Sequence, residues 1–142
     1  MTDAGQKADD GRRVVLVVDD DGDIRQALEM TLQYEGFDVW TAKDGVEALA
    51  RMEAEARPPA VVLTDLKMPG MDGLELLDRV VVQPDAPPVM LISGHGDVPV
   101  AVDAMQRGAV NFLEKPLEEH RVLVTVHKAL REKDLVEENR DL

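Results

Sequence analysis

The stretch of residues 61–73, which reads VVLTDLKMPGMDG, most constrains what this chain can fold into. Its opening apolar run has no helical period, ends at the single acid Asp65 and is followed by a loop that contains Pro69 and Gly70. A buried parallel strand that brings one carboxylate to the rim of a sheet has this pattern. The stretch therefore predicts a strand with Asp65 at its carboxyl end.

Three other apolar runs also end in polar residues. The run of residues 14–18 stops at three aspartates, the run 89–92 stops at Ser93, and the run 110–113 leads to Lys115. Ligands of open α/β sheets bind outside the carboxyl ends of the strands, so these endings are expected to converge. The side chains that would meet are three carboxylates, a hydroxyl and an ammonium group: Asp19, Asp20, Asp65, Ser93 and Lys115.

Apolar runs of strand length alternate along the chain with segments whose apolar residues recur at helical spacing. The expected strands cover about residues 13–18, 38–42, 60–64, 89–92 and 111–113, and a helix follows each of them. This alternation implies right-handed crossovers and a parallel sheet covered on both faces. We therefore expect an α/β, flavodoxin-like fold with five parallel strands in the order 2-1-3-4-5, flanked by five helices.

Helical spacing also predicts which side chains face the core. In the helix that begins at Asp44, the expected inward residues are Val46, Leu49, Ala50 and Met52. In the helix after the fourth strand, they are Val98, Ala101, Val102 and Met105.

The length of 142 residues fits one domain, which we place at residues 13–130. Residues 1–12 have no apolar period and are expected to form a disordered tail. After Leu130 the last helix becomes mostly charged. This part of the helix therefore has no apolar face that could pack on the domain core. We interpret residues 131–142 as the start of a helical linker to an output domain outside this sequence.

Composition excludes several classes of function. With 29 acidic and 16 basic residues, the formal net charge of −13 argues against binding nucleic acid through this segment. No apolar run approaches the roughly 20 residues of a membrane span, and the N-terminus lacks the apolar core of a signal peptide. The absence of cysteine rules out disulfides and thiolate metal sites and favours a reducing compartment, so the expected location is the cytoplasm.

The expected acid cluster requires a counter-charge. Carboxylates of Asp19, Asp20 and Asp65 brought together repel one another unless protons or a cation neutralise them, and Lys115 compensates only one charge. Oxygen ligands without histidine or cysteine suit a hard ion such as Mg²⁺ with several retained waters. We expect Asp20 and Asp65 to be direct ligands and Asp19 to act through water.

The same residues predict phosphoryl transfer onto a carboxylate. Asp65 would attack phosphorus, while Lys115 and the metal offset charge on the phosphoryl oxygens and the Ser93 hydroxyl donates to one of them. No Ser/His/Asp triad, P-loop or GxGxxG fingerprint is present in the sequence.

These residues resemble those of the receiver domain of two-component response regulators, CheY-like proteins, over about residues 13–130. The resemblance implies that Asp65 is the phosphoacceptor, charged by a phosphohistidine on a sensor histidine kinase. It implies that Asp20, Asp65 and the backbone carbonyl of Lys67 hold Mg²⁺. It also implies that Ser93 and Phe112 form a switch pair and that the Lys115–Pro116 peptide bond is cis.

Two segments resemble one subgroup of this family. Residues 93–99, SGHGDVP, and residues 137–142, EENRDL, are similar to those of activators of σ54-dependent, nitrogen-regulation type transcription, in particular the C4-dicarboxylate transport regulators. Ser93 stands where threonine is commoner in the family. The implied protein is a signalling switch in transcription regulation. From the apolar region of the last strand and from the linker, we expect homodimerisation through the fourth helix, fifth strand and fifth helix, with the C-terminal helix pairing alongside.

Other interpretations stay open on the sequence alone. The three aspartates 19–21 would equally fit a solvated face or an N-cap, and Phe112 would fit core packing. The alternative function is a Mg²⁺-dependent phosphohydrolase with an aspartyl-phosphate intermediate. Such an enzyme usually needs a second acid beside the nucleophile, and Leu66 and Lys67 supply none, so we favour a switch over an enzyme. The complete set of site residues disfavours a docking module without phosphorylation.

Overall fold

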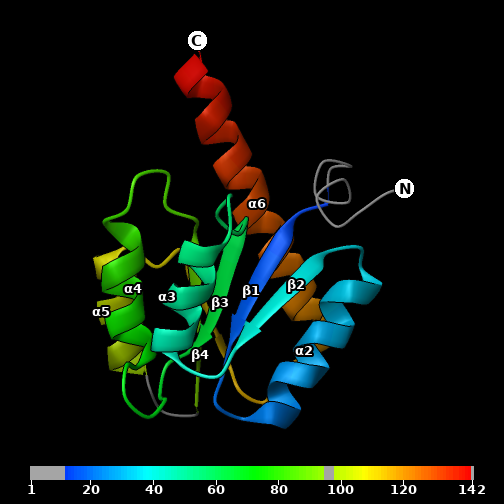
Figure 1. The fold of residues 1–142 in the computed structure, drawn as a ribbon, viewed down its shortest axis with the longest axis vertical. Helices are drawn as coiled ribbons and strands as arrows, with labels where there is room; N and C mark the ends of the chain where they lie inside the picture. The colour runs from blue at the N-terminus through cyan, green and yellow to red at the C-terminus, as the bar shows by residue number, and fades with distance from the viewer. Residues whose placement is uncertain (1–11, 95–97, 142) are drawn as a thin grey trace.

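The fold is a parallel sheet with helices on both faces (Figure 1). The structure, a computed structural model, describes residues 12–94 and 98–141. Its strands are β1 (Val14–Val18), β2 (Asp38–Ala42), β3 (Val61–Asp65), β4 (Val89–Ser93) and β5 (Asn111–Glu114). Its helices are α2 (Gly22–Tyr34), α3 (Gly45–Ala54), α4 (Gly73–Val81), α5 (Val98–Arg107) and α6 (Glu119–Asp141).

All strand pairs are parallel, and the strand order is β2-β1-β3-β4-β5. Within the described residues, five helices flank the sheet, so the predicted fold class and strand order are confirmed. The central strands β3 and β4 are buried at every position, as expected for a parallel sheet covered on both sides.

The core consists of two layers, one on each face of the sheet. Successive strand residues point to opposite faces, so Val15 and Val17 of β1 pack with α2 and α6, whereas Leu16 and Val18 pack with α3, α4 and α5. This alternation fixes the register of each strand, because a slip of one residue would exchange the two layers.

The parallel arrangement places the carboxyl ends of the strands along one edge. Backbone hydrogen bonds continue just past the strand ends: Leu66 N–H donates to Ile92 C=O at 2.8 Å, and Lys115 N–H donates to Ser93 C=O at 2.8 Å. The segments that follow β3 and β5 are therefore fixed against β4 where the polar side chains begin.

The predicted faces of two helices are partly wrong. In α3, Met52 is buried and Leu49 partly buried as expected, but Val46 is 62% exposed and Ala50 is exposed as well. Ala48 packs against the core instead. In α5, Ala101 and Ala104 are buried. The expected core residues of α5 that lie outward instead, at 43–59% exposure, are Val98, Val102 and Met105. Alanine faces the sheet because a small side chain lets a helix backbone approach it closely.

Helix α6 continues without a break past Leu130, and its C-terminal end projects beyond the sheet (Figure 1). Its apolar packing ends at Leu130, but Asp134 forms a 2.7 Å ion pair with Arg13, and Lys133 Nζ lies 3.5 Å from Ala86 C=O. Polar contacts thus hold α6 to the domain for one further turn. The expected tail lies outside the described residues except for Arg12, and no described helix combines the length and hydropathy of a membrane span.

Candidate functional site

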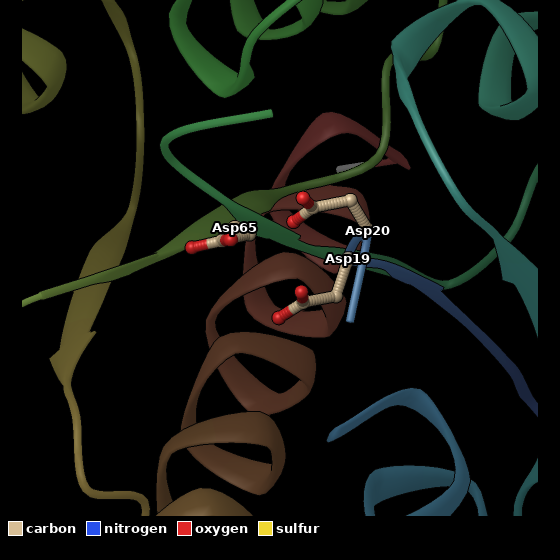
Figure 2. A group of neighbouring side chains, drawn as sticks. All are labelled: Asp19, Asp20 and Asp65. Carbon is tan, nitrogen blue, oxygen red and sulfur yellow. The ribbon is translucent and has the colours of Figure 1, made fainter. Parts of the chain in front are cut away.

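Three carboxylates meet at the carboxyl edge of the sheet. Asp19 and Asp20 follow β1, Asp65 ends the adjacent strand β3, and one oxygen from each lies within 4.8 Å of the others. Figure 2 shows the three carboxyl groups side by side. Asp19 is fully buried and Asp65 is 5% exposed, whereas Asp20 faces solvent. The structure therefore brings together the three acids that the strand endings predict.

Lys115 supplies the ammonium group of the cluster. Its Nζ atom lies 3.3 Å from Asp65 Oδ1 and 3.8 Å from Asp19 Oδ2. The hydrogen bond from its backbone to β4 fixes its position, and the Lys115–Pro116 peptide bond is cis, as expected. Asp65 Oδ1 also accepts a hydrogen bond from Leu66 N–H at 3.0 Å.

Ser93 contributes the hydroxyl at the end of β4. It is 2% exposed, and its Oγ atom has no hydrogen-bond partner among the described residues. Leu91 is paired with Phe112 on β5, and Ser93 lies two residues after Leu91, so all three side chains point to the same face of the sheet. Phe112 is partly buried against the core there.

Burial dominates the electrostatics of the two inner acids. It raises the pKa of Asp19 from 3.8 to about 6, opposed chiefly by the hydrogen bond from Asp21 N–H. It also raises the pKa of Asp65, and there the attraction of Lys115 is the main opposing effect. Two carboxylates in a poorly solvated position with one ammonium group make a site that favours a further positive charge.

The residues present fit a hard divalent cation. Asp19 Oδ2 is buried and accepts no hydrogen bond from any residue in the described ranges, so its lone pairs are left unsatisfied. All candidate ligands of the cluster are carboxylate oxygens, which suit Mg²⁺ better than a softer metal. Lys67, whose backbone carbonyl is the remaining predicted ligand, is exposed in the loop directly after Leu66.

The three consecutive aspartates have different structural roles. The side chain of Asp21 caps α2 by accepting from Asp23 N–H and Ile24 N–H. Its own backbone N–H donates to Asp19 Oδ1 at 2.9 Å. The N-cap interpretation is therefore correct for Asp21 alone, and the cap also holds the carboxylate of Asp19 in place.

Sequence reasoning missed two residues that support the site. Arg25 Nη1 donates to Asp19 C=O at 2.7 Å and so fixes the loop after β1. A Cβ atom on Gly73 would lie 2.3 Å from Asp65 C=O, so only glycine allows α4 to begin this close to β3. The sequence feature that could have indicated the role of Gly73 is its position directly after Asp72, the N-cap residue of α4.

The comparisons agree with this geometry. The sequence matches the family model of the response regulator receiver domain over residues 15–127. The chain belongs to the response regulator receiver family. This receiver is 46% identical over 134 residues to the C4-dicarboxylate transport transcriptional regulatory protein DctD of Pseudomonas aeruginosa, and it covers 28% of that relative. It is 41% identical over 130 residues to the nitrogen assimilation regulatory protein NtrX of Azorhizobium caulinodans. The predicted likeness to C4-dicarboxylate regulators is thus confirmed.

Solved structures show the same fold as this receiver. NtrX of Brucella abortus in complex with ADP matches with a TM-score of 0.86 at 39% identity, over 92% of this chain and 30% of that one. A receiver domain protein of Clostridium thermocellum matches with a TM-score of 0.82 at 31% identity, over 87% of this chain and 98% of that one. The chain spans 27% and 28% of the DctD proteins of Rhizobium meliloti and Pseudomonas aeruginosa.

Proposed function

We propose that Asp65 is the phosphoacceptor of this receiver and that a sensor histidine kinase supplies the phosphoryl group. The observation that carries the proposal is the position of Asp65 at the end of β3, buried, with Lys115 Nζ 3.3 Å from its Oδ1 atom. That oxygen also accepts a hydrogen bond from Leu66 N–H at 3.0 Å, which fixes the orientation of the carboxyl group.

The transfer exchanges one bond for another. An oxygen of Asp65 forms a bond to phosphorus while the bond from phosphorus to the histidine nitrogen breaks, and that nitrogen keeps the electron pair. Lys115 remains beside the new acyl phosphate and offsets part of its charge.

We further propose that Mg²⁺ binds at the acid cluster. Asp20, Asp65 and the backbone carbonyl of Lys67 would be direct ligands, and Asp19 would act through water. When bound, the ion neutralises charge on the acids and on the phosphoryl oxygens. The donorless Asp19 Oδ2 supports this assignment.

Ser93 and Phe112 are proposed to convert phosphorylation into a change of surface. The unpaired hydroxyl of Ser93 is positioned to donate to a phosphoryl oxygen, which would draw it toward Asp65. Phe112 lies on the same face of the sheet and would turn inward as Ser93 moves. The response would then reach α5, β5 and α6.

The output is proposed to be regulation of σ54-dependent transcription in the cytoplasm. The likeness to DctD and NtrX supports this, as does α6, whose end leaves the domain as a helix. We propose that residues 131–142 link the receiver to an output domain. The surface of α5, β5 and α6 would form a homodimer, because Val98, Val102 and Met105 of α5 are exposed there.

Phosphorylation by a small acyl phosphate tests the assignment of Asp65. The chain is incubated with acetyl phosphate and Mg²⁺, and intact mass measures incorporation. We expect one stable phosphoryl group, none on the variant Asp65→Asn, and normal labelling of the control Asp78→Asn, which removes an exposed carboxylate on α4. Labelling of Asp65→Asn would overturn the proposal, and rapid release of phosphate over many turnovers would favour the phosphohydrolase.

A further inference from the structure

A second hollow lies at the opposite edge of the sheet from the acid cluster. Its volume is about 650 Å³, and its walls come from the first residues of β1 and β2, the residue before β3 and the C-terminal end of α3. The strands between the two edges are five residues long, so about 15 Å separates this hollow from Asp65. It is independent of the phosphoacceptor site.

The hollow is basic, although the chain is strongly acidic. Four arginines line it, Arg12, Arg13, Arg51 and Arg57, against two acids, Asp38 and Glu55. The whole chain has 16 basic residues and a net charge of −13. A quarter of its positively charged residues therefore lie around one concave site.

The arginines remain available to a ligand. Arg12 pairs with Asp38 at 3.5 Å, Arg13 pairs with Asp134 at 2.7 Å and Arg51 Nε pairs with Glu55 at 2.9 Å, but these side chains are 30–51% exposed. Ion pairs this exposed contribute about 0–1 kcal/mol, so a multiply charged anion can compete for the guanidinium groups. Arg57 forms no ion pair with any residue that the structure describes.

An aromatic ring completes the wall. The guanidinium group of Arg51 lies 4.8 Å from the ring centroid of Trp40, within the range of a cation–π contact. This contact holds Arg51 at the hollow, where its planar guanidinium group can stack against a flat ring. Trp40 is the one tryptophan of the chain, so its fluorescence reports on this hollow alone.

We propose that this hollow binds a nucleotide, with its phosphates on the arginines and its base against Arg51 and Trp40. Guanidinium groups bind phosphate through paired hydrogen bonds. The volume falls within the roughly 300–1,000 Å³ that small-molecule sites occupy. A phosphate group alone would use the arginines but leave the aromatic wall unused.

Titration of Trp40 fluorescence tests the proposal. ATP and inorganic tripolyphosphate are titrated separately at low salt, with EDTA present so that divalent cations do not occupy the acid cluster. We expect ATP to change the fluorescence with saturation and to bind at least tenfold more tightly than tripolyphosphate. No saturable change with millimolar ATP, or equal affinity for both anions, would overturn the nucleotide assignment.

Matched variants separate this site from general charge effects. Arg57→Gln and Arg51→Gln are each expected to weaken ATP binding about tenfold, the usual effect of losing a charged hydrogen bond. The control Arg79→Gln removes an exposed arginine on α4, outside the hollow, and should leave affinity unchanged. Arg57→Gln breaks no described ion pair, so its fold should persist, as circular dichroism would verify. Equal losses in Arg57→Gln and Arg79→Gln would refute the site.

Discussion

Neutralising Asp19 should stabilise this domain when no metal is bound. Asp19 is fully buried, and its pKa is about 6 in the fold against 3.8 ordinarily. Well below pH 3.8 the carboxyl group is protonated in both the folded and the unfolded chain, so it contributes nothing to the pH dependence of stability there. As pH rises from 4 to 6 the unfolded chain releases this proton first, so the free energy of unfolding falls.

The size of the effect follows from the same shift. Since one pKa unit corresponds to about 1.36 kcal/mol, raising the value from 3.8 to about 6 makes ionised Asp19 destabilising by about 3 kcal/mol above pH 7. Asn has nearly the same shape, keeps an oxygen to accept from Asp21 N–H and carries no charge. We expect Asp19→Asn to be more stable by up to about 3 kcal/mol at pH 7.5 and by about half of that at pH 5.

Urea unfolding followed by circular dichroism at both pH values, with EDTA, measures the difference. The control Glu53→Gln removes an exposed carboxylate on α3 and should change stability by less than about 0.5 kcal/mol. Adding Mg²⁺ should stabilise the wild type more than Asp19→Asn, because binding to the folded state alone raises its stability. The reasoning is refuted if Asp19→Asn is no more stable than wild type at pH 7.5, or if its advantage does not shrink at pH 5.

Three further variants test other parts of the site. Gly73→Ala should destabilise the domain by about 1–3 kcal/mol in urea unfolding, because its Cβ meets Asp65 C=O, whereas Gly22→Ala, with an ordinary 3.5 Å contact, should be nearly neutral. Ser93→Ala should keep or raise the melting temperature, since its hydroxyl has no described partner, yet abolish the shift of the Phe112 ring resonances on phosphorylation. Lys115→Met should raise the pKa of Asp65 further and move the acid limb of the rate of phosphorylation by acetyl phosphate to higher pH; an unchanged limb would contradict the role of Lys115.

The sequence allowed the convergence of the side chains of the site to be predicted, because they follow local signals. Asp65, Ser93 and Lys115 each lie at or just past the end of a largely apolar run, and parallel strands bring such endings to one edge. The different roles of Asp19 and Asp21 could not be read from the sequence. Only the geometry of the cap decides which of the consecutive acids turns toward the helix.

The helix faces were harder to predict because α5 carries apolar residues on more than one side. Periodicity groups residues into faces but does not say which face packs on the sheet when alanines compete with larger side chains. Ala101 and Ala104 pack inward, and Val102 stays half exposed. Likewise, the apolar pattern of α6 ends at Leu130, but Asp134 is held by Arg13, which is 121 positions away in the chain.

The features that weaken the unphosphorylated domain are those that make it responsive. Burial raises the pKa of both Asp19 and Asp65, and the buried hydroxyl of Ser93 has no hydrogen-bond partner among the residues that the structure describes. A phosphoryl group on Asp65 would give Ser93 an acceptor and Lys115 a stronger partner at the same time. Its attachment would thus be favoured by interactions that the free site leaves unmade. We propose that the resulting movement at β4 would reach Phe112, which lies on the same face of the sheet. A site already satisfied in its resting state would have no comparable free-energy difference with which to drive that change.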